Sequence, residues 1–253
     1  MGTGLFLLLV ALVCRGFYVG AENLGYNWQW YRIPRYFGTF EPVGWRIGPL
    51  LSGLLITLKV VIVSLLLSLF VGLLVALMRL TRSPVARCLA SCYLELVRNT
   101  PLLVQIFLIY FVLAPILGIE RFAAAVLALS LFEGAYASEI FRAGILAIPL
   151  GQWEAAASLG MTPQQRYRHV VLPQALRNMA PPLTSQGISL IKDSALVSTI
   201  AIYDLSMRGQ QLVAESFLTF EVWFSIALIY LCLTLSLSAV VRLLEWRLGS
   251  PQA

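Results

Sequence analysis

Long apolar runs without charge constrain the fold of this chain more than any other feature. A helix needs about 20 apolar residues to cross the hydrocarbon core, where it satisfies its own backbone hydrogen bonds. Such runs occupy residues 60–78, 102–118 and 222–241, and residues 2–20 form another that is uncharged except for Arg15. The 253 residues are 59% hydrophobic and only 12% charged, which is more apolar side chain than a soluble domain of this size could bury. The chain is therefore predicted to be an integral membrane protein.

Two further runs, residues 122–142 and 183–203, are interrupted by charged residues but are still expected to span the membrane. The N-terminal run could instead be a cleaved signal, because Val-Gly-Ala at residues 19–21 resembles a small-residue cleavage site. No positive charge precedes that run, which favours a retained anchor helix. We expect an all-α helical bundle with about six transmembrane helices.

Arginine and lysine counts in short loops predict which side of the membrane each loop faces. Residues 79–98 contain four arginines, residues 142–177 contain four more, and Arg242 and Arg247 lie near the C-terminus. These segments and both termini are predicted to be cytoplasmic. The loop at residues 21–49 is an exception, because it carries three arginines and two glutamates and should lie outside.

The net charge of +6 follows from this topology and from contact with anionic membrane lipid, so nucleic-acid binding is not indicated. The four cysteines lie in or near apolar runs, and the chain has one histidine. A zinc site would need four convergent ligands, so no metal site is expected.

A polar segment at residues 151–178, GQWEAAASLGMTPQQRYRHVVLPQALRN, separates two predicted spans on the cytoplasmic side. Its alanine-rich start favours a short helix, and Gly160 is a natural stop. Thr162 with Gln165 forms a capping-box pattern that predicts the start of a second helix. That second helix is expected to end at Leu172-Pro173.

The first of these helices carries three alanines, so it has little side chain of its own to hold it in place. Such a helix suits docking into a groove on another subunit. The alternative is an elbow that lies on the lipid headgroups.

The order of residues in this segment resembles the EAA loop of binding-protein-dependent ABC importer permeases. Glu154-Ala155-Ala156 is followed by Gly160 and then by Val170-x-Leu172-Pro173, where the family usually has isoleucine at position 170. Other segments resemble the polar amino acid branch of that family: RNTPLLVQ at residues 98–105, GAYASEIFR at 134–142, IPLGQ at 148–152 and IKDS at 191–194. The likeness extends over residues 50–247.

The resemblance implies a MetI-like fold for residues 50–247, with a cytoplasmic EAA coupling loop at residues 143–178. An anchor helix and extracytoplasmic loop (1–49) would precede this domain, and a tail (248–253) would follow it. The subunit would lie in the bacterial cytoplasmic (inner) membrane and pair with a second copy or with a homologous permease. Its other partners would be an ABC ATPase subunit and an extracytoplasmic binding protein that delivers a small polar amino acid.

The resemblance places the contact with the ATPase at these residues: Glu154, Ala155, Ala156, Gly160, Leu172 and Pro173. The chain contains no Gly-x-x-x-x-Gly-Lys-Ser/Thr phosphate loop. ATP and Mg²⁺ are therefore expected on the partner ATPase, and no cofactor or catalytic residue is expected on this chain.

Polar and ionisable groups inside the predicted spans mark the expected substrate pathway, because intramembrane charges usually face a protein interior or a watery cavity. These residues are Glu133, Tyr136, Glu139, Arg142, Gln186, Lys192 and Asp193. The first four are spaced three apart, which places them along one slowly drifting stripe of a helix. Alternatives are a subunit contact for Glu133, an ion pair between Glu139 and Arg142, and plain helix packing around Gln186.

Residues 131–145 and 184–188 look most similar to permeases of acidic amino acid importers, so glutamate or aspartate is the favoured substrate. Carboxylates on the route are not obvious partners for an anion, and glutamine or another polar amino acid remains open. An ion- or proton-coupled secondary transporter is the alternative function. That class often shows an internal repeat of its spans, and this sequence shows none.

Overall fold

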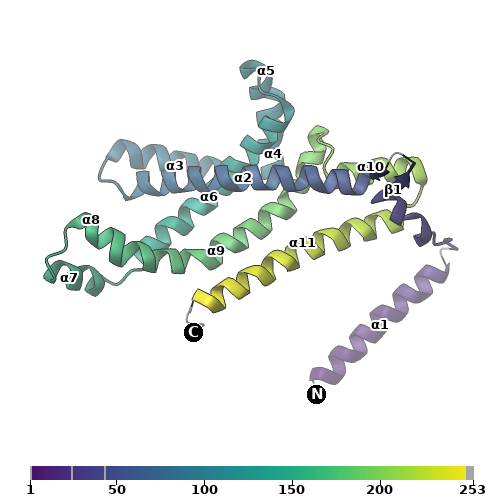
Figure 1. The fold of residues 1–253 in the computed structure, drawn as a ribbon, viewed down its shortest axis with the longest axis horizontal. Helices are drawn as coiled ribbons and strands as arrows, with labels where there is room; N and C mark the ends of the chain where they lie inside the picture. Colours follow the sequence, from purple (N-terminus) through teal and green to yellow (C-terminus); the bar gives the residue numbers. More distant parts are fainter. Residues whose placement is uncertain (1, 24, 43, 249–253) are drawn as a thin grey trace.

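The computed structural model describes residues 2–23, 25–42 and 44–248, which form a largely helical bundle (Figure 1). The elements in chain order are α1 (Gly2–Asn23), η1 (Trp30–Arg32), η2 (Pro34–Tyr36), β1 (Gly38–Glu41), β2 (Gly44–Ile47), α2 (Pro49–Leu80), α3 (Pro84–Arg98), α4 (Leu102–Phe107), η3 (Leu108–Leu113), α5 (Ala114–Leu117), α6 (Arg121–Leu146), α7 (Leu150–Ser158), α8 (Pro163–Arg166), η4 (Tyr167–Val171), α9 (Leu172–Asp193), η5 (Ser194–Ile200), α10 (Leu205–Ser216) and α11 (Thr219–Leu248).

Three helices among the described residues are long and apolar enough to cross a membrane: α2, α6 and the Thr219–Leu243 part of α11. At 1.5 Å per residue α2 is about 48 Å long, well beyond a hydrocarbon core of about 30 Å. The helix pair α3 and Leu102–Leu117 passes the same test as one broken span. The apolar part of α1, Gly4–Gly20, is shorter than a full span.

Figure 1 shows α2, α6 and α11 running towards the end of the bundle that carries α7 and α8, while α9 runs back from it. We call this the elbow end. The opposite end carries α10 and the β1–β2 hairpin, and we call it the hairpin end. In the same view α1 stands apart from the other helices.

Small residues bring α2 and α6 into close contact along their length. The Ser130 hydroxyl donates to the Ser64 carbonyl at 3.3 Å across the interface. Further along, a Cβ added at Gly72 would lie 2.7 Å from the Ala137 Cβ and 3.0 Å from the Gly134 carbonyl oxygen. Such close packing of small residues is what holds helices together in lipid, where burial of apolar surface gives no drive.

Gly72→Val should therefore force α2 and α6 apart and destabilise the bundle by about 1–3 kcal/mol, the usual cost of overpacking a core. The measurement is the thermal midpoint of the detergent-solubilised protein. Leu73→Val is the matched control, because Leu73 is exposed on the outer side of the same helix. Equal midpoints for the two variants would contradict this account of the packing.

The predicted span at residues 102–118 is not an independent straight helix. The α4–η3–α5 arm meets α3 at an angle of 106°, and Figure 1 shows it projecting away from the bundle. At the bend the Gln105 amide donates to the carbonyls of Val97 at 2.7 Å and Thr100 at 3.1 Å. Those carbonyls have lost their helical partners at the end of α3, so Gln105 stabilises the bend.

Residues 79–98 were expected to form a cytoplasmic loop, and that expectation was wrong for most of the segment. The helix α2 continues to Leu80, and α3 then folds back as an amphipathic helix that packs beside α2 and α6. Ser83 caps α3 by accepting the Ala86 amide, and Pro84 occupies its first turn.

The predicted span at residues 183–203 is part of a longer element. The helix α9 begins at Leu172, contains Pro181 and Pro182, and ends at Asp193, after which the 3-10 helix η5 continues to Ile200. It packs along α6 and α11. The polar residues of α9 lower its hydropathy, so α9 is not among the helices apolar enough to span a membrane. Such residues are tolerated inside a membrane where the helix packs against other helices instead of facing lipid.

The segment before α2 is an ordered cap on the hairpin end rather than a plain loop. Its two-stranded antiparallel hairpin pairs Gly38 with Ile47 and Glu41 with Gly44. Ile33 is buried in one cluster with Leu50 of α2, and this cluster also includes Leu205 and Val222 from α10 and α11. Hairpins have no helical signature, so the all-α prediction missed this one.

Candidate functional site

The elbow at residues 150–173 folds as its sequence predicts up to Gln165. The helix α7 ends in a Schellman arrangement, in which Met161 N–H donates to the Ala156 carbonyl at 3.2 Å and Gly160 N–H to the Ala157 carbonyl at 2.9 Å. Gly160 has φ +75°, a conformation that side chains rarely adopt. The Thr162–Gln165 capping box then starts α8.

The prediction that Leu172-Pro173 ends the second helix was wrong. The chain widens into the π-helix η4 over Tyr167–Val171, and Leu172 and Pro173 form the first turn of α9. Proline lacks an N–H and its ring clashes with the carbonyl four residues before it in a regular helix. A π turn just ahead of Pro173 avoids that clash, so the helix continues.

The predicted coupling residues differ in exposure. Glu154, Ala155, Gly160, Leu172 and Pro173 are exposed, whereas Ala156 is buried. Leu150 and Leu159 at the two ends of α7 are 77% and 78% exposed, which is unusual for leucines on a polar segment. Glu154 therefore stands on a surface with small and apolar neighbours, and Ala156 packs inward.

The inward face of the elbow is tied to the membrane helices. Trp153 of α7 packs edge-on against Tyr167 of η4, with ring centroids 5.0 Å apart. A buried cluster of Ile148, Val171, Ala175 and Met179 lies below, and Ile145 of α6 packs against it. A displacement of α7 would therefore be transmitted to both α6 and α9.

The second candidate site is a buried polar cluster between α6 and α9. Glu133 is 1% exposed, and its Oε2 accepts a hydrogen bond from the Gln186 amide. The Asp193 carboxyl lies within interaction distance of Glu133. The Glu133 Oε1 atom is buried and has no hydrogen-bond partner among the described residues. The structure thus brings together three of the predicted pathway residues in one buried polar cluster.

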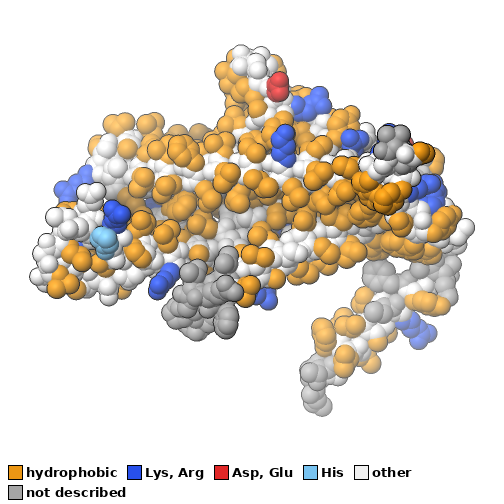
Figure 2. Space-filling model, in the orientation of Figure 1, with side chains coloured by type: hydrophobic (Ala, Val, Ile, Leu, Met, Phe, Trp, Pro, Cys, Tyr) orange, Lys and Arg blue, Asp and Glu red, His pale blue; other side chains and the backbone are white. Residues whose placement is uncertain are grey.

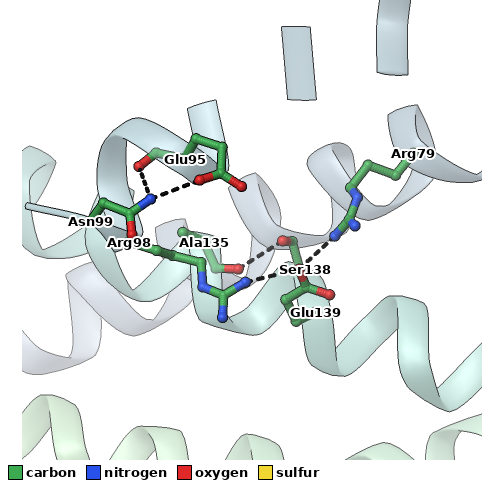
Figure 3. A network of polar contacts seen from close by, with 7 residues as sticks. All are labelled: Arg79, Glu95, Arg98, Asn99, Ala135, Ser138 and Glu139. Atoms are coloured by element: carbon green, nitrogen blue, oxygen red, sulfur yellow. Dashed lines mark hydrogen bonds and ion pairs between the residues drawn. The ribbon is translucent and has the colours of Figure 1, made fainter. Parts of the chain in front are cut away.

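Glu139 belongs to a different cluster. Its Oε1 accepts from the Arg79 guanidinium at 2.7 Å and from the Arg98 guanidinium at 3.1 Å (Figure 3). The three residues come from α2, α3 and α6, so they clamp the fold-back of α3 onto the bundle. The proposed pairing of Glu139 with Arg142 was wrong, because Glu139 pairs with Arg79 and Arg98 instead.

The residues of the predicted stripe on α6 therefore contact different helices: Glu133 contacts α9, whereas Glu139 contacts α2 and α3. A spacing of three turns each successive side chain by about 60° around the helix, so Glu133 and Glu139 point about 120° apart. Tyr136 lies beneath the Arg98 guanidinium, 5.7 Å from its ring centroid, and Arg142 is partly exposed nearer the elbow end. Lys192 is exposed beside Asp193.

The contact of Arg79 with Glu139 was not predicted, because the two residues lie 60 positions apart and Arg79 resembles an ordinary loop arginine. Asp204 at the hairpin end was also missed as a structural group. It is fully buried and caps α10 by accepting the Met207 amide at 2.9 Å. Burial raises the pKa of Asp204 to about 6.

Figure 2 shows hydrophobic side chains covering the middle of the molecule, with lysines and arginines at both ends, at the base of the projecting arm and along the lower edge. The lone histidine lies at the elbow end. No group of metal-ligating side chains is found among the described residues. A membrane bundle that carries a helical elbow at one end and a buried polar cluster inside is the architecture that the resemblance to ABC importer permeases implies.

Comparison with known proteins agrees with that class. Residues 68–250 match the family described as "Binding-protein-dependent transport system inner membrane component". The L-cystine transport system permease TcyB of Bacillus subtilis is 39% identical over 79% of this chain and 87% of its own. The glutamine transport system permease GlnP of Escherichia coli is 38% identical over 81% of this chain and 95% of its own.

Solved structures agree as well. One described as an amino acid ABC transporter with histidines is 40% identical, covers 79% of this chain and 94% of its own, and superposes with a TM-score of 0.73. The methionine transporter MetNI, at 24% identity and a TM-score of 0.62, shares the fold.

This chain belongs to the family of inner-membrane permeases of binding-protein-dependent ABC transporters. It is the permease subunit of an ABC amino acid importer, a multi-pass inner-membrane protein whose family works with a separate ATPase and a binding protein. An ion-coupled secondary transporter is not favoured by these findings.

Proposed function

We propose that this permease moves a polar amino acid inward by alternating access, driven by a partner ATPase that docks on the elbow. The observation that carries this proposal is the exposed surface of α7 around Glu154, which is packed rigidly onto α6 and α9 from behind. The elbow end then faces the cytoplasm, in keeping with its arginines, and the hairpin end faces outside.

In this mechanism Glu154 forms a charge-assisted hydrogen bond or ion pair with the ATPase. Exposed Leu150 and Leu159 contribute apolar contact on either side of it. Closure of the ATPase pair on ATP and Mg²⁺ pushes the elbow, and the Ile148–Met179 cluster transmits that motion to the membrane helices. A two-state bundle can be biased by such a push because packed interfaces rearrange between discrete states.

The substrate route runs past Glu133, Gln186 and Asp193. A buried acceptor without a donor is costly, and a bound ligand that donates a hydrogen bond there would remove the cost. The α-ammonium group of an amino acid and the side-chain amide of glutamine are such donors. Glutamine, one of the substrates that the sequence left open, therefore fits this cluster better than an acidic amino acid does.

A second permease copy is the partner we propose for the α4–η3–α5 arm. The arm projects from the bundle and exposes large apolar side chains, with Phe111 at 61% and Ile116 at 74%. Lipid could cover the same surface, but the substrate route of an importer needs a wall opposite α6 and α9. A second subunit would supply that wall.

The test is reconstitution of the permease with its ATPase in liposomes. Uptake of labelled glutamine should require ATP, Mg²⁺ and the binding protein together, and excess unlabelled glutamate should compete poorly. Uptake by the permease alone would contradict ATPase coupling. Strong competition by glutamate would contradict the substrate assignment while leaving the coupling intact.

A further inference from the structure

A basic hollow opens at the hairpin end, between the N-terminal cap and α10. Its volume is about 400 Å³. The lining includes Arg35 from η2, Arg46 from β2 and Arg208 from α10, with the hydroxyls of Thr39 and Ser52 beside them. The guanidinium fork matches the two oxygens of a carboxylate, and the Thr39 hydroxyl can donate as well. The Ser52 hydroxyl donates to the Pro49 carbonyl at 2.9 Å.

Arg208 is held in place by apolar and aromatic contact. Its guanidinium lies over the Tyr203 ring, 4.9 Å from the centroid, and its Nη1 donates to the Gln211 side chain at 3.2 Å. Its stem passes Gly53, where an added Cβ would lie 2.9 Å from the Arg208 Cγ. The Arg208 Nε atom is buried and has no hydrogen-bond partner among the described residues.

Arg35 is held by its own neighbour. Its Nη2 donates to the Tyr36 hydroxyl at 2.9 Å, and its guanidinium lies over the same ring. The cap that carries it is fixed by Ile33 in the buried cluster and by the Gly48 amide, which donates to the Phe37 carbonyl at 2.9 Å. Arg35 itself is exposed and is oriented before any partner arrives.

Neither Arg35 nor Arg208 forms an ion pair with a carboxylate in the part of the chain that the structure describes. The hollow also explains why the loop at residues 21–49 breaks the charge rule for membrane topology. Two of its three arginines, Arg35 and Arg46, line the hollow with Arg208 at the hairpin end instead of marking a cytoplasmic loop.

The hollow is separate from the buried polar cluster. Ser52 lines the hollow, whereas Ser68 lies level with Gly134, next to Glu133. The two serines are sixteen positions apart on α2, which corresponds to about 24 Å. Most of its lining comes from residues 35–52, which precede the residues 68–250 that match the family, whereas Arg208 lies within the matched part.

We propose that this hollow is a docking site for an acidic side chain on the extracytoplasmic binding protein, with Arg35 and Arg208 as its main contacts. The inference rests on the proposed function, which puts the hairpin end outside the cell. Charge complementarity favours this occupant, because Arg35 and Arg208 are oriented and lack carboxylate partners. The binding protein must also be recognised and released in each transport cycle, which suits contacts between charged surface groups. Docking of this kind affects the association rate and its salt dependence most strongly.

The experiment measures ATPase activity of the complete transporter in nanodiscs against the concentration of its purified, amino-acid-loaded binding protein. The variants are Arg35→Gln, Arg208→Gln and the double variant. Each single change should raise the half-maximal binding-protein concentration up to about fivefold at low salt, the upper range for an exposed ion pair. The double variant should show a larger rise and a weaker dependence on salt, with unchanged activity at saturation.

Arg35→Lys and Arg208→Lys keep the charge and should retain most of the affinity. Arg32→Gln is the matched control, because Arg32 lies in the same cap, does not line the hollow and donates to Gln29 at 2.9 Å. An unchanged half-maximal concentration and salt dependence in the double variant would overturn the proposal.

Lipid headgroups offer the same anionic chemistry, so the assay is run in phosphatidylcholine alone and with phosphatidylglycerol added. An effect of the variants that appears only with phosphatidylglycerol, on basal activity and not on the half-maximal concentration, would assign the hollow to lipid and overturn the proposal. If no binding protein stimulates the unsubstituted transporter, the proposed function fails, and that result is distinct from loss of stimulation in the variants alone.

Discussion

Glu154→Lys should abolish ATP-driven uptake, with a loss of about a hundredfold or more, while the permease still inserts and folds. Glu154 is exposed on α7, and its side chain makes no contact that holds the elbow together. The substitution removes a charge-assisted hydrogen bond, worth about 1.5–3 kcal/mol, and adds a repulsive charge at the docking surface. The measurements are ATP-dependent uptake in liposomes and co-purification of the ATPase.

Two variants separate charge from shape in that experiment. Glu154→Gln keeps the size and hydrogen-bonding capacity and should retain part of the activity. Gln164→Lys adds the same positive charge to exposed α8, beyond the Gly160 turn, and should transport close to normally. Full uptake by Glu154→Lys would refute docking through α7.

Glu133→Gln should raise the KM for uptake by about tenfold or more, because it neutralises the buried acceptor proposed to hold the substrate's donor group. The free Oε1 of the carboxylate gives way to an amide that accepts more weakly and brings donors of its own. The measurement is the concentration dependence of uptake at saturating ATP and binding protein, together with the thermal midpoint of the purified variant.

Glu139→Gln is the matched control on the same helix. Glu139 bridges Arg79 and Arg98 instead of facing Gln186, so its loss should lower the thermal midpoint without changing the KM. A Glu133→Gln variant with unaltered KM and a lowered midpoint would show that Glu133 supports packing only. A changed KM in Glu139→Gln would show that the substrate pathway also includes the cluster of Glu139, Arg79 and Arg98.

The elbow shows which features could be read from sequence. The Gly160 stop and the Thr162–Gln165 capping box formed as predicted, because each depends on hydrogen bonds that reach only a few residues along the chain. The apolar runs likewise predicted α2, α6 and α11. The outcome at Pro173 could not be predicted in this way. Proline usually ends a helix, but here the π turn in η4 allows the helix to continue through Pro173.

Local chemistry along the chain was enough to predict a membrane protein, its main spans and most of the elbow, and the order of residues in the elbow carried the resemblance to the permease family. Packing of helices distant in sequence decided which polar groups meet. Glu133 meets Gln186 across 53 residues, and Glu139 meets Arg98 across 41 and Arg79 across 60. A buried charge is stabilised only by the groups that surround it, so the same residue type on one helix can face a substrate route or a structural clamp. The basic hollow likewise exists only where the N-terminal cap closes on α10, because no short stretch of sequence contains all of its arginines.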